Sequence, residues 1–239
     1  MFLIYLFLSF NWQKLTSGNV EIAIASDINF DKSTTIGNAN LRLVGTNQTI
    51  NTSTARTLPK LYISNGGTKT FNGDYIINQQ LSLVDGMVVP QGGFLIAAAG
   101  VLDPANAGSA TSFVAGKLLR EFNGTPLIYP IGVNGNYTPV SVVSATGANP
   151  VIGITAFDSA PTVPVEELPK GVVQTSTNWS WGVTAPAASS FTTAIFSFPF
   201  LPEDRAAFGE DGYRPVVLYN ESGQPTATLY NSDINASGV

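Results

Sequence analysis

Two tryptophans separated by one residue, Trp179 and Trp181, are the side chains of this sequence best suited to holding a sugar ring. On a strand both would point to the same side, because side chains alternate between the two faces, and together they would form an aromatic platform. That side would equally serve as the inside of a β-domain, where tryptophan contributes a large buried area. We favour the core alternative, since exposed aromatic clusters are the rarer arrangement.

Arg42 and Tyr62 form a second pair of candidate binding residues. With Ser82 they occupy equivalent positions in three similar segments that begin 20 residues apart, at positions 41, 61 and 81. Stacked segments would line these side chains up on one outer face. There, an arginine and a tyrosine could contact a ligand.

Catalytic chemistry has few candidate residues in this chain. It contains no His and no Cys, which removes the commonest general base, the thiolate nucleophile and the usual zinc ligands. Asp74 and Asp85 come nearest to a calcium site, but such sites usually group several acidic residues at tight spacing. We therefore predict no catalytic residue, no metal site and no cofactor, and expect a protein that is not an enzyme.

The segments that would position these residues repeat. Leu41-Arg-Leu-Val-Gly, Leu61-Tyr-Ile-Ser-Asn and Leu81-Ser-Leu-Val-Asp share one pattern, and Val20-Glu-Ile-Ala-Ile fits it 21 residues before the first. Residues 19–112 are thus predicted to form a short right-handed β-solenoid-like stack of about four coils, closed by a strand at 94–99. The residues expected inside the stack are Leu41, Leu43, Leu61, Ile63, Leu81 and Leu83, and those expected at one corner are Gly45, Asn65 and Asp85.

Residues 113–239 have a different pattern, which is typical of an antiparallel β-sandwich-like domain. We expect this domain to be incomplete at the C-terminus. Asn-Gly pairs at 123–124 and 134–135 each lie between β-prone segments and predict type I′ hairpins. Further features are strands at 151–157, 179–183, 192–200 and 215–219, a Pro-rich connection at 159–169 and one short helical turn at 202–208. The predicted fold class is all-β.

Composition narrows the range of partners. Charged residues make up only 11% of the 239 residues, and the 11 Lys and Arg are scattered. No phosphate-binding surface can be assembled from local sequence, so nucleic acid is excluded as a partner. Thr, Ser, Asn and Gly must supply the polar surface, as they do in extracellular β-proteins. The lack of cysteine in such a protein points to a bacterial surface.

The N-terminal segment 1–18 is expected to be a signal peptide or a truncated N-terminus. Its apolar run, residues 1–10, is too short to span a bilayer as a helix and has the length of a signal-peptide core. The first cation, Lys14, follows this run instead of preceding it, so an internal start and a native buried strand remain as alternatives. We expect no stable membrane span.

Four segments carry a resemblance to a known group of proteins: 81–88, 93–100, Ser112-Phe-Val-Ala-Gly-Lys-Leu-Leu-Arg120 and Tyr129-Pro-Ile-Gly-Val-Asn-Gly-Asn-Tyr-Thr-Pro-Val140. They resemble large secreted surface proteins of Bacteroidota, which carry β-solenoid-like repeats, β-sandwich modules and often a C-terminal sorting domain for type IX secretion. The resemblance implies export to the outer face of the outer membrane and an adhesin-like or stalk role, with a surface glycan or another surface protein as partner. It also implies O-glycosylation at Ser159, but it brings no catalytic residues.

Two functional classes remain. The first is a non-catalytic exported module for adhesion or spacing, and the second is a piece of a carbohydrate-active β-helix protein, either a polysaccharide lyase-like enzyme or a carbohydrate-binding module. A lyase needs a groove with a basic residue beside charge-neutralising calcium or arginine. The cations of the repeats stand singly, at Lys32, Arg42, Arg56, Lys60 and Lys69. We therefore favour the first class.

Overall fold

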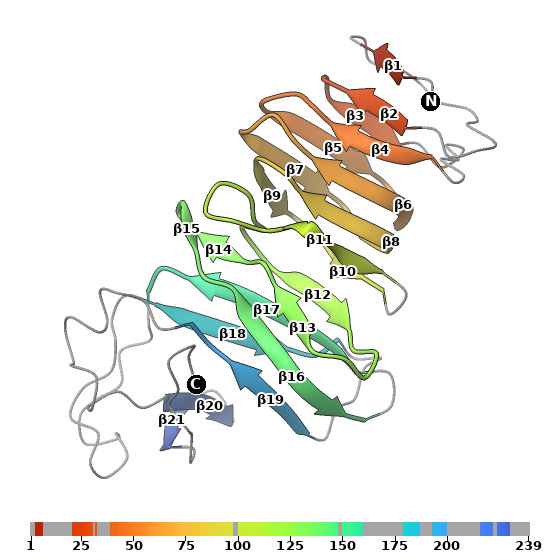
Figure 1. Cartoon of the computed structure of the whole chain (residues 1–239). Helices are drawn as coiled ribbons and strands as arrows, with labels where there is room; N and C mark the ends of the chain where they lie inside the picture. Colours follow the sequence, from red (N-terminus) through yellow and green to blue (C-terminus); the bar gives the residue numbers. More distant parts are fainter. Residues whose placement is uncertain are drawn as a thin grey trace.

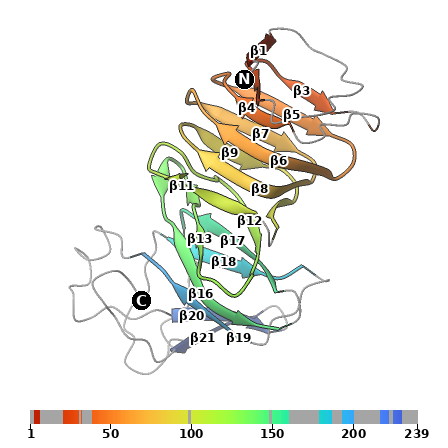
Figure 2. The same cartoon turned by 45° about the vertical axis from the view of Figure 1, so that its right-hand side comes forward.

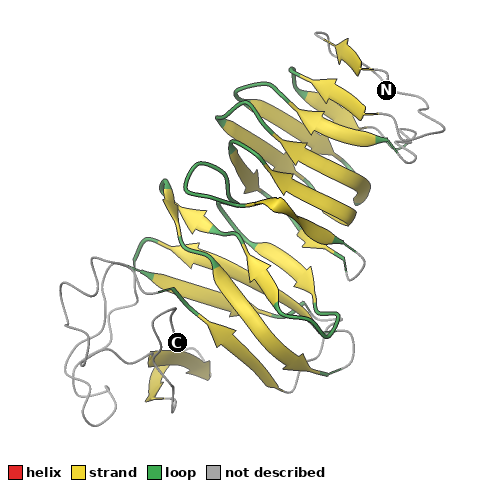
Figure 3. Ribbon diagram, viewed as in Figure 1, coloured by secondary structure: helices red, strands yellow, loops and turns green. Residues whose placement is uncertain are grey.

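The computed structural model describes residues 21–30, 32, 39–97, 100–147, 150–159, 179–186 and 193–199, and the backbone of the strands 3–6, 216–221 and 224–229. All regular structure in this part of the chain is β (Figure 1, Figure 3), which confirms the all-β prediction. The helical turn expected at 202–208 lies outside the described residues. In the described part, no helix is long and apolar enough to cross a membrane.

Two parallel sheets form the walls of a β-solenoid-like stack of about five turns (Figure 1, Figure 2). The parallel strands of sheet A are β1 (Leu3–Leu6), β2 (Glu21–Ile24), β4 (Asn40–Leu43), β6 (Arg56–Ile63), β8 (Tyr75–Leu83), β10 (Phe94–Ile96) and β12 (Leu118–Glu121). The strands of sheet B are β3 (Ile28–Phe30), β5 (Gln48–Thr52), β7 (Thr68–Asn72) and β9 (Met87–Pro90). From β2 to β10 the chain alternates between the two sheets, so each turn adds one strand to each.

The stack is longer than the sequence pattern indicates. β10 pairs in parallel with β8 on one side and with β12 on the other. It therefore continues sheet A, whereas the sequence led us to expect a closing strand there. β11 (Val101–Ala107) pairs with the second half of β8, after β10 has paired with the first half.

Apolar side chains fill the interior between the two sheets. Leu41 pairs with Leu61, which pairs with Leu81, so the 20-residue period places equivalent side chains directly above one another. All six residues predicted to lie inside the stack are buried, none more than 3% exposed. Larger rings complete the core, with Phe71 in edge-on contact with Tyr75 and Phe94 at centroid distances of 5.0 and 5.1 Å.

The predicted alignment of the first repeat is wrong by two residues. The sequence pattern pairs Val20 with Leu41, but in the structure Ile22 pairs with Leu41 and Ile24 with Leu43. A shift of two residues returns every side chain to the same face of the strand. Alternating hydrophobicity therefore predicts which side chains face inward, and leaves the register undetermined.

Gly45, Asn65 and Asp85 lie in the turns at one corner of the stack, as the sequence predicts, but only Asn65 of these three has a left-handed backbone. Asn65 has a φ of 66°, and the two following glycines also have positive φ. The Nδ2 of Asn65 donates a hydrogen bond of 2.7 Å to the carbonyl of Val44 in the neighbouring turn. The turns are thus hydrogen-bonded to each other at the corner as well as along the strands.

After the stack the chain becomes antiparallel. β17 (Val151–Phe157) and β18 (Ser180–Thr184) extend sheet A beyond β12, and a three-stranded sheet is formed by β13 (Leu127–Tyr129), β16 (Val140–Thr146) and β19 (Thr193–Ser197). Two hairpins are formed by β14 (Gly132–Val133) with β15 (Asn136–Tyr137), and by β20 (Val216–Glu221) with β21 (Gln224–Leu229). The four strands predicted after residue 150 fall on β17, β18, β19 and β20.

Only one of the two Asn-Gly hairpins is present. Asn134 and Gly135 have φ values of 48° and 80° and join β14 to β15, as a type I′ turn requires. At the other site Gly124 alone has positive φ, and the flanking strands β12 and β13 belong to different sheets. The prediction of a hairpin at 123–124 is therefore wrong, because β12 finds its partners in β10 and β17.

The three-stranded sheet packs against the extension of sheet A. The phenol of Tyr129 on β13 donates a 3.0 Å hydrogen bond to the carbonyl of Ile152 on β17, and both residues belong to the same apolar cluster as the interior of the stack. Sheet A crosses the boundary expected at residues 112–113 without a break. A separate β-sandwich-like domain stays a prediction.

Candidate functional site: the outer faces of the two parallel sheets

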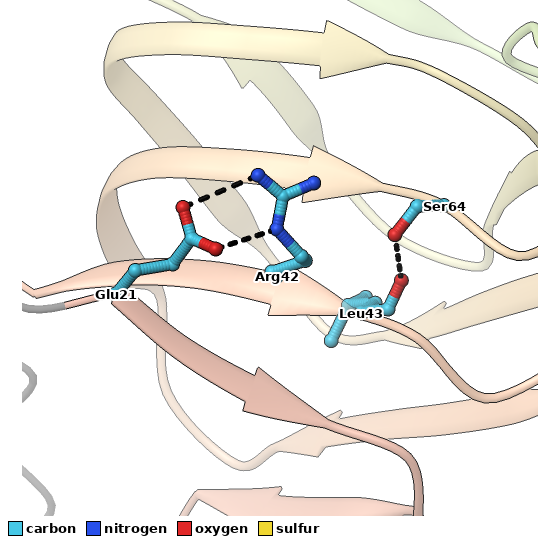
Figure 4. Close-up of polar contacts among 4 residues, drawn as sticks. All are labelled: Glu21, Arg42, Leu43 and Ser64. Carbon is cyan, nitrogen blue, oxygen red and sulfur yellow. Dashed lines mark hydrogen bonds and ion pairs between the residues drawn. The ribbon is translucent and has the colours of Figure 1, made fainter. Parts of the chain in front are cut away.

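The candidate residues Arg42 and Tyr62 lie side by side on the outer face of sheet A. They pair directly across β4 and β6, and the guanidinium carbon of Arg42 lies 4.6 Å from the centroid of the Tyr62 ring. On its other side Arg42 meets Glu21 of β2, with Nε to Oε1 at 2.7 Å and Nη2 to Oε2 at 3.2 Å (Figure 4). The predicted alignment of these two residues is confirmed.

This arrangement holds three neighbouring turns together. The fork of the guanidinium matches the two carboxylate oxygens, while its flat face covers the tyrosine ring. The side chains of Arg42 and Glu21 are 29% and 18% exposed, so the pair is screened only in part by solvent. Sequence reasoning did not name Glu21, although the repeat places it at the position equivalent to Arg42. In the structure it pairs with Asn40, two residues away and on the same face as Arg42.

Ser82 continues the same row but is fully buried. Its hydroxyl donates to Oδ2 of Asp103 at 2.8 Å, and the same oxygen accepts from Nδ2 of Asn106 at 2.9 Å. The amide of Ala105 donates to Oδ1 at 3.1 Å. The hydrogen bonds from Asn106 and Ser82 hold the pKa of Asp103 below its usual range.

At the corner beside this row, the hydroxyl of Ser64 donates to the carbonyl of Leu43 at 3.0 Å (Figure 4). The backbone amide of Ser64 donates to the same carbonyl. The polar side chains near the corner therefore bond to the neighbouring turn.

Sheet B carries a ladder of amides that the sequence analysis did not identify. Asn29, Asn51 and Asn72 pair in register on its outer face. Nδ2 of Asn51 donates to Oδ1 of Asn29 at 2.7 Å, and Nδ2 of Asn72 donates to Oδ1 of Asn51 at 2.8 Å. In the sequence these three asparagines are separated by 22 and 21 positions. This spacing can be recognised only once the strands of sheet B are aligned.

The one lysine of sheet B, Lys69, points into the stack and is fully buried. Its ammonium donates to the carbonyls of Gly66 and, at 3.3 Å, of Thr46. Burial lowers the pKa of Lys69, and the nearby charge of Asp85 partly offsets this effect. Lys69 thus holds the corner together from the inside and is not available to a ligand.

Trp181 lies on the inner face of sheet A. It pairs with the buried Ala156 of β17, packs against the apolar core and contacts the ring of Phe198 at a centroid distance of 5.2 Å. Trp179 precedes β18 and is half-buried, with its indole nitrogen inaccessible to solvent. This geometry matches the alternative in which Trp181 packs inside a β-domain. Its ring is not displayed as a platform for a sugar.

Ser159 lies two residues after the end of β17 and is exposed. Its carbonyl accepts a 2.6 Å hydrogen bond from the hydroxyl of Ser180, and the carboxylate of the preceding Asp158 accepts from Nδ2 of Asn134. These contacts leave the Ser159 hydroxyl without a hydrogen bond to the described residues. Its glycosylation stays a prediction.

The described residues contain no group of three or more His, Cys, Asp or Glu placed to hold a metal ion. Comparison with protein-family models, with curated proteins and with solved structures gives no match to this chain.

Proposed function

We propose that this protein is a non-catalytic, exported surface module, adhesin-like or stalk-like, that works as part of a larger bacterial protein. The observation that carries the proposal is that the polar side chains of the stack are engaged in contacts within the protein. On the outer faces of both parallel sheets they contact side chains of the neighbouring turn, as in the row Glu21–Arg42–Tyr62 and the ladder Asn29–Asn51–Asn72.

Three charged side chains that could do acid-base chemistry are occupied in the same way. Arg42 is neutralised by Glu21, Asp103 accepts three hydrogen bonds, and the ammonium of Lys69 is enclosed by carbonyl groups. A lyase-like enzyme would need a lysine or arginine side chain that is free to act, in its neutral form, as the base that takes a proton from the substrate. These contacts support a scaffold over an active site.

The residues after the stack fit the same role. Face-to-face packing of the three-stranded sheet on the extension of sheet A, through Tyr129 and Ile152, supports a β-sandwich-like unit built onto the end of the stack. Such a unit would space the stack from whatever follows. Export to the outer face of the outer membrane by type IX secretion, and binding to a surface glycan or another surface protein, are part of this proposal.

The experiment combines two assays on the purified chain. A panel of acidic polysaccharides is incubated with it to detect eliminative cleavage, and a glycan array measures binding. We expect no unsaturated products from any polysaccharide. Turnover that is abolished by a single Lys, Arg or Asp substitution would overturn the proposal in favour of the enzyme alternative.

A further inference from the structure

The outer face of sheet B is a regular polar surface over β3, β5 and β7, and it ends at Met87 and Val89 of β9. Beside the amide ladder runs a second row, in which Thr49 of β5 pairs with Thr70 of β7. Both threonines face outward, because the residues on either side of each of them are buried. Adjacent strands lie about 4.8 Å apart, so the hydroxyls and amides recur at that interval along the axis of the stack.

This surface is rigid before any ligand arrives. Each amide of the ladder is fixed by its neighbour, and the backbone amide of Thr49 is fixed by a 2.7 Å hydrogen bond to Oδ1 of Asp27. An Asn side chain has two N–H donors, and the ladder uses one of them in Asn51 and in Asn72. A ligand that binds the remaining donors and the hydroxyls would not have to order these side chains, which favours affinity.

Charge selects the class of ligand. The four strands of sheet B contain one charged residue, Lys69, and its side chain points inward with no exposure. Acidic residues stand at the strand ends, with Asp27 before β3, Asp74 after β7 and Asp85 before β9. An acidic polymer would meet these three carboxylates and, two residues after β3, the exposed cation Lys32, so the balance of charge disfavours it. A neutral polymer rich in hydroxyls would meet matching donors and acceptors.

We infer that the outer face of sheet B binds a neutral polysaccharide, whose chain runs across the strands and uses the Asn29–Asn51–Asn72 ladder together with Thr49 and Thr70. A polymer suits the surface because repeated weak contacts on one chain add up through effective concentration. This inference rests on the proposed surface-module function and names its ligand class.

The test measures how much of the purified chain sediments with insoluble cellulose and with chitin, with soluble polygalacturonate and alginate as competitors. Thr49→Lys with Thr70→Lys places two long side chains on the proposed face. The matched control, Val84→Lys with Val101→Lys, adds the same charge at two positions outside sheet B that are 42% and 50% exposed. Circular dichroism confirms that both double variants keep the fold of the parent.

We expect the parent chain and the control variant to bind at least one of the two neutral polymers. The Thr49→Lys, Thr70→Lys variant should bind at least tenfold more weakly, and the acidic polymers should not compete. No binding to either neutral polymer, binding that the sheet B variant leaves unchanged, or displacement by an acidic polymer would each overturn the inference. None of these outcomes involves cleavage, so they are distinct from the turnover that would overturn the proposed function.

Discussion

Leu61 shows most simply how a single side chain supports the stack. It is fully buried between Leu41 and Leu81 of the neighbouring turns. Leu61→Asp would place an unpaired carboxylate there, and we expect a loss of more than about 4 kcal/mol of the free energy of unfolding. Urea unfolding followed by circular dichroism measures it, with the outward-facing Lys60→Asp as control. An unchanged midpoint for Leu61→Asp would contradict the account.

The ion pair of Glu21 and Arg42 should contribute a modest coupling. Its bidentate geometry strengthens it, but both side chains are partly exposed. A double-mutant cycle with Glu21→Gln and Arg42→Gln should give a coupling free energy of about 1 kcal/mol that falls as salt is added. A coupling of zero at low salt would mean that the pair does not join β2 to β4.

Asp103 should make stability depend on pH in the acid range. Its pKa is lower in the folded chain than in the unfolded chain, because Asn106 and Ser82 donate to its carboxylate. The stabilisation is therefore complete above the unfolded pKa of about 3.9 and is lost as the pH falls through the lower folded value. Urea unfolding at a series of pH values should show a smaller acid-induced loss for Asp103→Asn than for the parent. Parallel pH profiles would rule this role out.

The elements of the stack depend on close approach of the backbone at its corners. A Cβ on Gly67, where φ is +65°, would lie 1.8 Å from the carbonyl oxygen of Thr46. Gly135 has a similar φ of +80° in the β14–β15 turn, but no atom lies within 4 Å of its Cβ position. We expect Gly67→Ala to cost more than about 3 kcal/mol and Gly135→Ala about 1 kcal/mol, the cost of backbone strain alone. Equal losses of thermal stability would contradict the packed corner.

The sequence predicts which residues of the sheet A strands face inward better than it predicts how these strands pair. The recurring Leu-x-Leu pattern is sufficient to place Leu41 and Leu61 inside and Arg42 and Tyr62 outside, because alternation has only two solutions. It could not predict that Ile22 opposes Leu41, since a shift of two residues keeps the same pattern. Glu21 lies on the same face as Arg42 in either register, so its contact with Arg42 could have been predicted from the repeat.

Sheet B was harder to predict because its strands vary more. The buried position next to the corner is Gln48 in one turn, Lys69 in the next and Val88 in a third. A polar or charged residue at a core position breaks the hydrophobic pattern, although here each polar side chain bonds to carbonyl groups of the corner. The register of these strands does not follow from such a pattern, and the Asn ladder was missed for that reason.

In the molecule as a whole, sheet A links the stack to the antiparallel strands that follow it. β12 is both the last parallel strand of the stack and the first partner of the antiparallel β17. Beside it, β11 pairs with β8 alone and contains Pro104 and a register shift. Proline and irregular register are features that discourage an edge strand from pairing with other chains.

The chain forms one stack in which each parallel strand of sheet A, from β1 to β12, lies in register with the strand one turn away. Nuclear Overhauser effects between backbone protons of neighbouring strands test it most directly. We expect contacts of Ile22 with Leu41, of Leu41 with Leu61 and of Leu61 with Leu81. Antiparallel contacts between strands adjacent in sequence, such as β5 with β6, in place of this series would contradict it.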